Sequence, residues 1–345
     1  MAATPARGRR KTGPSIEDVA RLAGVSAQTV SRVANGSEQV RPDTRSRVLG
    51  AMRQLGYAPN QAARALRNGA FGAIGLLAHR FERTGPALTT QAVLNAAEAE
   101  GYSVTLINVS DPFLAGWRNA AARLSNQAVD GLVILRTEAE TPETLALPVG
   151  LPVAVSDSKL AGYCPTVVTD QVQGSLDAVR HLLSLGHRTV HHIAGPAKSD
   201  PASLRQAAWQ RALEEAGIVA PPPWPGDWTA RSGYLAGQQI AADPAVTAVY
   251  CANDEMAFGL IRALHEAGRP VPADVSVVGF DGIALGEFAS PPLTTVAQDY
   301  GAIGQALVEL LVEQIRSGTS LGSKRVTVPT ELIIRATTAA PAADP

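Results

Sequence analysis

Near the N-terminus, three short amphipathic stretches follow one another so closely that they can form only a small bundle of three helices. Ser15 and Asp18 can form a capping box at the start of the first helix, and Gly24 ends that helix in a tight turn. Apolar residues then recur at helical spacing over residues 27–34 and again over residues 42–55. Two short helices joined by a glycine-containing turn form a helix-turn-helix unit, whose second helix fits the major groove of DNA.

Charge is distributed unequally along the chain. Residues 1–70 contain twelve Arg or Lys and four Asp or Glu, a net charge of +8, whereas the other 275 residues contain eighteen and twenty-seven, a net charge of −9. The total of −1 therefore conceals a basic head on an acidic body. A basic helical head is typical of nucleic-acid binding, although three helices of this kind also occur in bundles that never contact DNA.

Length and composition indicate how many domains the chain has and which cellular compartment suits it. A length of 345 residues is natural for two or three domains, and no run of eighteen apolar residues predicts a membrane span. Residues 1–14 are basic but lack the apolar stretch of a secretory signal, so we expect a disordered arm there. We also expect a disordered tail at residues 339–345. Cys164 and Cys251 lie far apart, which favours a reducing cytoplasm over a disulfide scaffold.

Beyond the head, apolar runs of strand length alternate with helical stretches. The predicted strands include residues 73–78, 103–109, 131–135, 152–156, 189–194, 248–251, 275–280, 326–328 and 332–334. A βαβα alternation that pauses near Asp170 and starts again is typical of two doubly wound parallel sheets. The predicted fold is therefore an all-α helix-turn-helix head with a hinge helix, followed by an α/β body of two doubly wound parallel-sheet lobes.

Polar side chains directly follow several of these strands, namely Asp157, Asn253 and Asp281. Ligands of open parallel sheets bind outside the carboxyl ends of the strands, so two facing lobes would hold one ligand in the cleft between them. Carboxylates and amides can bond adjacent sugar hydroxyls, Arg205 can bridge hydroxyls, and Trp228 offers a flat apolar face to a pyranose. The alternatives are that Trp228 packs in the core and that Asp281 caps the next segment.

Motifs for catalysis or metal binding are not found. Of the six His, only His187 and His191 are spaced i and i+4, and they fall in a predicted turn and strand rather than on one helix face. There is no close Cys pair, and neither a G-x-S-x-G elbow nor a Walker loop occurs. We therefore expect a binding protein rather than an enzyme, with no metal and no cofactor besides a small-molecule effector. Two alternatives stay open: a periplasmic-type sugar-binding protein, which the basic head opposes, and an α/β enzyme acting on sugars, which a turnover assay would reveal.

Several motifs resemble the lactose/galactose repressor (LacI/GalR-type) family over about residues 15–338. The head and hinge motifs are DVARLAGVSAQTVSRVANG at residues 18–36, Thr44-Arg45, and GYAPNQAARAL at residues 56–66. In the body they are GDWTARSGY (226–234), CANDEMAFG (251–259), VVGFD (277–281) and PPLTTVAQDY (291–300). The resemblance implies a homodimeric transcriptional repressor that binds a near-palindromic double-stranded operator under the control of a galactoside, another glycoside or a disaccharide.

The resemblance also implies the domain limits. They are a helix-turn-helix domain at 15–59, a hinge helix and linker at 60–71, and a sugar-binding and dimerisation domain of periplasmic-binding-protein type at 72–338. Late segments are expected to cross back, so that lobe 1 comprises about 72–168 and 300–324, and lobe 2 about 169–298 and 325–338. The C-terminus carries no leucine heptads, so we expect a dimer rather than a larger assembly.

The DNA-contacting residues follow from the same resemblance. Gln28 can pair with adenine and Arg32 with guanine, whereas Ala27 could touch only a thymine methyl group. In the hinge, Asn60 can cap a short helix, Ala63 would contact the partner's helix, and Leu66 would wedge between base pairs in the minor groove. The expected phosphate contacts are Ser26, Thr29, Ser31 and Asn35.

The effector site implied by the resemblance comprises Asp157, Arg205, Trp228, Asn253, Asp281, Tyr300 and, on spacing, Gln298. Arg83, Gly85 and Thr89 stand where the lactose-type pattern has aliphatic residues near the aglycone, and Pro201 replaces a sugar-contacting serine. We therefore expect a more polar and more open aglycone side. Neither the sugar, the operator, nor the choice between inducer and corepressor follows from the sequence.

Overall fold

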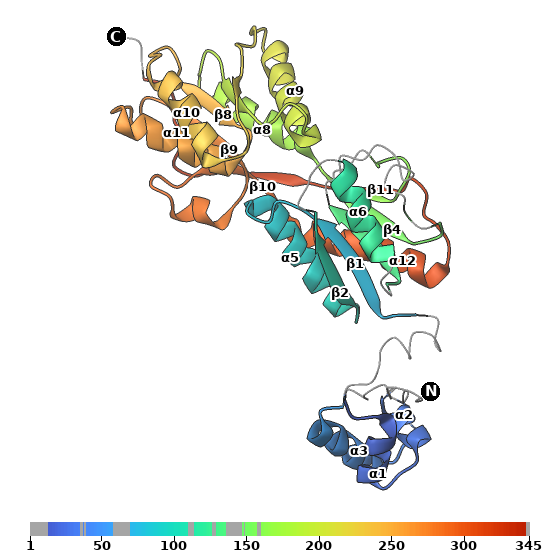
Figure 1. Ribbon diagram of the computed structural model, residues 1–345. Coiled ribbons are helices and arrows are strands. Elements are labelled where there is room, and N and C mark those ends of the chain that lie inside the picture. Colours follow the sequence, from blue (N-terminus) through green and yellow to red (C-terminus); the bar gives the residue numbers. More distant parts are fainter. Residues whose placement is uncertain are drawn as a thin grey trace, which may run out of the picture. The chain divides into compact units, whose positions relative to one another are not determined.

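The computed structural model describes residues 13–34, 37, 39–57, 70–109, 114–125, 129–135, 147, 149–156 and 160–342. The chain divides into two compact units, Met1–Phe71 and Gly72–Pro345, which are shown in Figure 1. Among the described residues, no helix is long and apolar enough to cross a membrane.

Within its described residues, the N-terminal unit contains three short helices, as the sequence predicts. They are α1 (Ile16–Ala23), α2 (Ala27–Ala34) and α3 (Pro42–Leu55), and Val19, Val30 and Val48 are fully buried in the core they share. Since each helix has only two to four turns, most of its stability comes from this packing rather than from helix propensity.

Capping residues fix where these helices begin and end. The backbone N–H of Asp18 donates to the Ser15 hydroxyl at 3.3 Å, and the Ser15 N–H donates to the Asp18 carboxylate at 2.9 Å, which confirms the predicted capping box. Gly24 ends α1 in the left-handed conformation with φ of 64°. Arg41 precedes α3 without a side-chain cap, so Pro42 at the first turn is what favours the start of that helix.

The second unit contains two six-stranded sheets. In lobe 1 the strand order is β2 (Ser103–Asn108), β1 (Ala73–Ala78), β3 (Gly131–Leu135), β4 (Val153–Ser156), β5 (Thr166–Thr169) and β11 (Arg325–Val328). In lobe 2 it is β7 (Trp224–Pro225), β6 (His191–Ala194), β8 (Ala248–Cys251), β9 (Ser276–Asp281), β10 (Thr294–Gln298) and β12 (Thr330–Ile333). All pairings are parallel except that of β10 with β12, so the predicted pair of parallel-sheet lobes is confirmed.

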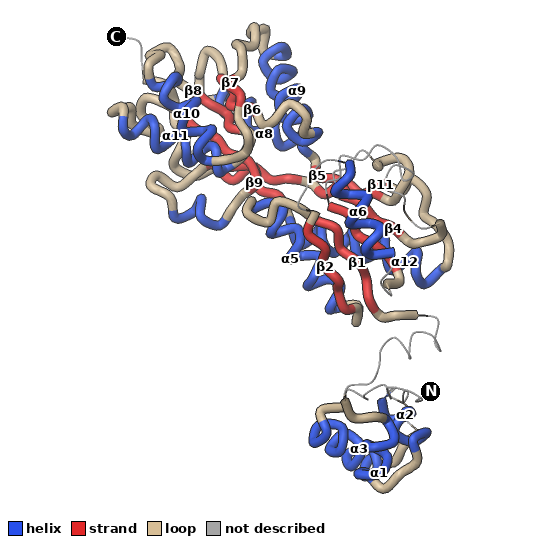
Figure 2. Tube along the Cα trace, viewed as in Figure 1, coloured by secondary structure: helices blue, strands red, loops and turns tan. Residues whose placement is uncertain are grey.

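Helices cover both faces of each sheet (Figure 2). Lobe 1 has α5 (Thr84–Ala99) and α12 (Tyr300–Ser317) on one face and α6 (Leu114–Ser125) on the other. Lobe 2 has α8 (Gln171–Ser184) and α9 (Asp200–Glu215) on one face and α10 (Ala230–Ala241) and α11 (Asp254–Glu266) on the other, with a short 3₁₀ helix at Ala284–Phe288.

Small residues allow some of these helices to approach closely. A Cβ atom on Gly304 of α12 would lie 2.5 Å from the backbone of Ala92 in α5, and one on Gly259 of α11 would lie 1.9 Å from the carbonyl oxygen of Ala230 in α10. Trp117 and Trp209 are fully buried and pack in the cores of lobes 1 and 2, as expected from their positions on helices. Each side chain of this size contributes on the order of 3 kcal/mol by leaving water.

The chain passes between the lobes at three places, after β5, after β10 and after β11. The limit predicted for the last passage is wrong, because residues 325–328 belong to lobe 1, where Arg325 pairs with Thr166 and Val328 with Thr169. The passage lies at Pro329, between β11 and β12. Proline lacks the N–H that a continuous strand would need. However, β11 joins lobe 1 through partners more than 150 residues away, whereas β12 joins lobe 2 by pairing with β10.

Candidate functional site

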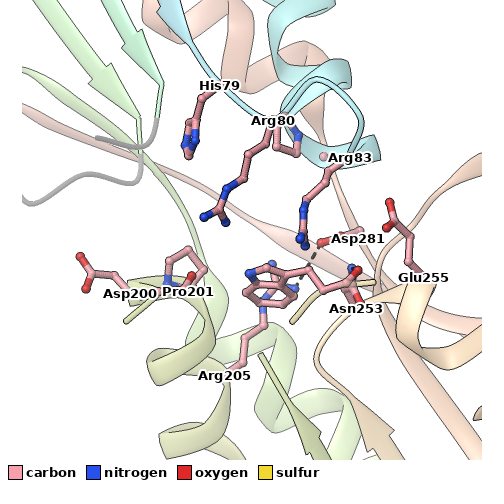
Figure 3. A pocket seen from close by; sticks show the side chains of 13 residues that line it. His79, Arg80, Arg83, Asp200, Pro201, Arg205, Asn253, Glu255 and Asp281 are labelled. Carbon is pink, nitrogen blue, oxygen red and sulfur yellow. Dashed lines mark hydrogen bonds and ion pairs between the residues drawn. The ribbon is translucent and has the colours of Figure 1, made fainter. Parts of the chain in front are cut away.

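A cavity lies between the two lobes of the second unit, at the carboxyl ends of their strands (Figure 3). It opens to solvent and, with the open solvent included, has about 790 Å³ of space. Lobe 1 lines it with His79, Arg80, Arg83, Gly85 and Pro86. Lobe 2 contributes Ser199, Asp200, Pro201, Arg205, Trp228, Asn253, Glu255 and Asp281.

The buried guanidinium of Arg205 organises the lobe 2 wall. Its Nε donates to Gln171 Oε1 at 2.7 Å, and its Nη1 donates to the Ala252 carbonyl and to Asp281 Oδ1, the latter at 3.2 Å. The guanidinium carbon lies 3.6 Å from the centroid of the Phe280 ring. Only 2% of Arg205 is exposed, so its charge is held by one carboxylate, two polar partners and one aromatic face.

Asp281 lies at the end of β9 with a φ of 114°, a conformation that L-residues rarely adopt. Gln298 Nε2 donates to Asp281 Oδ1 at 2.7 Å and to the Tyr300 hydroxyl at 3.3 Å. Gln298 is buried and, like Tyr300, is not among the residues that line the cavity. Gln298 therefore lies behind Asp281, where it orients the carboxylate, and Tyr300 contacts Gln298.

Trp228 also has a left-handed backbone, with φ of 75°, and its indole lies against Gly195. A Cβ atom on Gly195 would come within 2.6 Å of the indole Cη2 atom, so only glycine leaves room for the ring in this position. The Arg205 guanidinium lies 5.4 Å from the indole centroid. Gly195 is a part of the site that the sequence did not reveal, because its role depends on a side chain 33 positions away.

Asn253 caps α11, since its Oδ1 accepts the N–H of Met256 at 3.1 Å, and its Nδ2 donates to the Trp228 carbonyl at 3.1 Å. The cap is thus Asn253 and not the adjacent Asp254. Asp254 is fully buried and accepts bonds from Thr295 Oγ1 at 2.5 Å and from the Ile283 N–H at 2.9 Å. Burial, and then the charge of Asp281, raise the pKa of Asp254 to about 8.

Polar contacts join the two lobes at the mouth of the cavity. Arg83 Nη1 donates to the Asp227 carbonyl at 2.6 Å. Glu255 Oε1 accepts from the Thr84 N–H at 3.1 Å and from the Thr84 hydroxyl at 2.8 Å. The Glu255 carboxylate thus caps the N-terminus of α5 across the cavity, where the helix dipole favours a negative charge.

The remaining predicted pocket residues differ in their placement. Pro201 lines the cavity, as do Arg83 and Gly85. Thr89 is buried and donates to the Gly85 carbonyl at 2.9 Å, so it supports the lobe 1 wall from behind. Asp157 lies outside the described residues. In the described part of the chain, no three His, Cys, Asp or Glu side chains gather as a metal ion would require.

In the N-terminal unit, Gln28 and Arg32 are exposed on α2, where a spacing of four residues places them on one helix face. Ala27 is half-buried against the core of the three helices. The hydroxyls of Ser26 and Thr29 lie 2.9 Å apart, and Ser26 also accepts the Thr29 N–H at 3.2 Å, which makes it a helix cap. Ser31 is half-buried, whereas Asn35, Asn60, Ala63 and Leu66 lie outside the described residues.

Comparison with known proteins supports this pairing of a helical head with a two-lobed body. Residues 15–60 match "Bacterial regulatory proteins, lacI family", and residues 179–338 match "Periplasmic binding protein-like domain". The HTH-type transcriptional repressor PurR of Pectobacterium carotovorum subsp. carotovorum (strain PC1) is 35% identical over 311 residues, which are 88% of this chain and 91% of that protein. The lactose operon repressor of Escherichia coli (strain K12) is 34% identical over 331 residues, 95% of this chain and 91% of that protein.

Solved structures give the same result. The lac repressor dimer bound to operator and the anti-inducer ONPF matches with a TM-score of 0.86 and 33% identity, over 95% of this chain and 100% of that one. The transcriptional regulator CelR in complex with cellobiose matches with a TM-score of 0.69 and 30% identity, over 94% and 99%. The fold and these relatives define a DNA-binding transcriptional repressor with a ligand-binding body. The chain belongs to the lacI family of bacterial regulatory proteins.

Proposed function

We propose that this protein is a cytoplasmic, homodimeric repressor whose affinity for operator DNA is controlled by a small sugar bound between the two lobes. The observation that carries this proposal is the lobe 2 wall, where Arg205, Asp281, Trp228 and Asn253 converge on one cavity. A charged pair, an amide and an aromatic face are what a pyranose needs, since its hydroxyls alternate with apolar C–H surfaces. Asp157 is proposed to complete this set.

Operator recognition is assigned to α2. Gln28 and Arg32 are exposed on one helix face, so both can reach base edges in the same major groove, Gln28 on adenine and Arg32 on guanine. Ala27 would add only an apolar contact to a thymine methyl group. Two copies of the head on one duplex would read half-sites about one helical turn apart, which accounts for a near-palindromic operator.

The hinge provides the proposed link between ligand and DNA. Helices of the length predicted after Asn60 are unstable alone in water, and two of them can order only when they pair in the minor groove. Ala63 would form the contact between them, and Leu66 would wedge into the base stack. Sugar binding changes the relation of the lobes and thereby the pairing of the hinges, so ligand and operator affect each other's binding through one coupling free energy.

A ligand screen followed by a DNA-binding assay tests this function. The full chain is heated with a panel of mono- and disaccharides and, as a different ligand class with flat faces, with purine bases. A sugar at a hundred times its dissociation constant should raise the melting temperature by on the order of 5 °C. The sugars should be recovered unchanged, because binding without turnover is expected. Stabilisation by a purine base but by no sugar would contradict the proposed effector class.

A further inference from the structure

The loop that joins β1 to α5 places two guanidinium groups, those of Arg80 and Arg83, in the lobe 1 wall of the cavity (Figure 3). Arg80 has a φ of 57°, a left-handed conformation that is uncommon for a long side chain. Its side chain extends into the cavity, and within the described residues it forms no ion pair and no hydrogen bond. A strained backbone therefore presents a cation that the described part of the protein leaves unpaired.

Arg83 lies close enough to Arg80 for the two charges to act on each other. Burial, and then the Arg80 charge, lower the pKa of Arg83, and these effects outweigh the opposing influence of Asp227, Glu255 and Glu82. One of its amino groups bonds the Asp227 carbonyl, but its buried Nε has no hydrogen-bond partner. An unpaired buried donor costs free energy until a ligand satisfies it.

Among the described residues, the carboxylates that line or border the cavity are largely engaged elsewhere. Glu255 accepts two bonds from Thr84, and Asp281 is bonded by Arg205 and Gln298. Asp227 accepts the Thr229 N–H at 2.9 Å and the Thr229 hydroxyl at 2.5 Å.

Asp200 stands on the opposite rim, and its carboxylate points away from the two guanidiniums in Figure 3. In addition, the first turn of α5, which borders the same wall, contains no acidic residue. The positive end of this helix is met from lobe 2 by the Glu255 carboxylate, which is thereby engaged and not available to the two arginines.

We propose that the effector is a sugar that carries an anionic group, a carboxylate or a phosphate, and that Arg80 and Arg83 bind this group. This inference rests on the proposed sugar-responsive function of the same cavity. The neutral ring would stack on Trp228 and bond the Arg205–Asp281 pair, while the anion lies against lobe 1. Guanidinium groups match the planar carboxylate and the phosphate oxygens with paired hydrogen bonds, which a neutral aglycone could not use.

Matched ligand pairs test the proposal on the full chain. Dissociation constants are measured by calorimetry for galactose against galacturonate and galactose 6-phosphate, and for glucose against glucuronate and glucose 6-phosphate. At least one anionic sugar should bind about tenfold or more tightly than its neutral partner, and the gain should shrink as salt is raised. The uronate and phosphate arms show which anion the arginines accept.

Substitutions at Arg80 and Arg83 test whether these two residues cause the preference for the anionic sugar. Arg80→Asn removes the charge with a residue that tolerates the left-handed backbone, and should abolish the preference for the anionic sugar over its neutral partner. Arg80→Lys keeps the charge and should retain most of it. Arg83→Gln should also reduce the preference. Arg325→Asn, which removes an exposed charge at the start of β11, is the control and should change nothing.

The outcomes separate the two proposals. Equal binding of neutral and anionic sugars, or a preference that survives both Arg80→Asn and Arg83→Gln, would overturn the anionic effector and leave the sugar-responsive function intact. If no sugar of either kind binds, the proposed function fails together with it.

Discussion

The two walls of the interlobe cavity are built in opposite ways. On lobe 2, Arg205 is almost fully buried, Asp281 is held by two side chains, and Trp228 is fixed against Gly195. On lobe 1, Arg80 is exposed and unpaired within the described residues, and Arg83 is only half-buried.

This difference separates two tasks. The lobe 2 wall is preorganised, so little entropy would be lost when it binds the proposed sugar ring. In the proposed function, the lobe 1 wall would instead contribute the group that distinguishes one sugar from another. Because Arg83 and Thr84 also bond across the mouth, the ligand's variable end and the lobe arrangement are linked at the same place.

The largest effect is expected from Arg205→Ala. Removing this guanidinium leaves the Asp281 carboxylate in a poorly hydrated site without a counter-charge, so we expect a loss of about 3–5 kcal/mol in the free energy of unfolding. Urea denaturation measures it. Arg211→Ala on the same helix, whose exposed ion pair with Glu215 should contribute little, is the control. Similar losses for the two variants would mean that the lobe 2 wall is not organised by Arg205.

The next largest effect is expected from Gly195→Ala, which should weaken ligand binding more than it destabilises the fold. The added methyl group would meet the indole of Trp228 at 2.6 Å and the Cβ atom of Ala202 at 2.8 Å, so the ring must shift. We expect all sugars to bind about tenfold more weakly, because a shift of this kind misplaces the stacking face. Calorimetry measures it, with Gly50→Ala, where the new methyl group meets nothing, as the control. Unchanged affinity would remove Trp228 from the binding site.

A pH dependence is expected from Asp254. The pKa of Asp254 is about 8 in the folded protein, above its value in the unfolded chain. Protonation of Asp254 therefore stabilises the fold fully below about pH 4, and this stabilisation is lost as the pH rises toward 8. The difference in unfolding free energy between the natural protein and Asp254→Asn should therefore change between pH 5 and pH 8, to the disadvantage of the natural protein. His192 has the opposite effect on stability, because burial lowers its pKa to about 4. Since both proteins contain His192, its effect cancels in the difference between them. A pH-independent difference would show that Asp254 stays ionised, and exposed Asp274→Asn is the control.

The smallest effect is expected from Glu255→Ala, which removes the cap that lobe 2 supplies to α5. The half-buried contact should contribute less than about 1 kcal/mol, enough to shift the population of lobe arrangements but not the fold. Small-angle scattering of the ligand-free protein should report a larger radius of gyration. Glu255→Gln keeps an acceptor for Thr84 and should restore most of the closed population. An unchanged radius in Glu255→Ala would mean that this contact does not hold the lobes.

Local chemistry explains which of these features the sequence could predict. The capping box at Ser15 and the polar residues after the strands, such as Asn253 and Asp281, depend on neighbours within a few positions. Which sheet β11 joins, and the space that Gly195 leaves, depend on partners brought together only by folding. The placement of Gln298 behind Asp281, rather than in the cavity, depends on the same long-range packing.

The central claim is that ligand binding in the cavity controls the affinity for operator DNA. Measuring operator binding with and without sugar tests this claim most directly. The full chain is titrated onto a duplex selected for tight binding, with and without a saturating sugar found in the thermal screen. We predict a change in operator affinity of about tenfold or more, and no change in Trp228→Ala, which keeps the DNA-binding head but loses the stacking face. An operator affinity that is the same with and without the bound sugar would contradict this account.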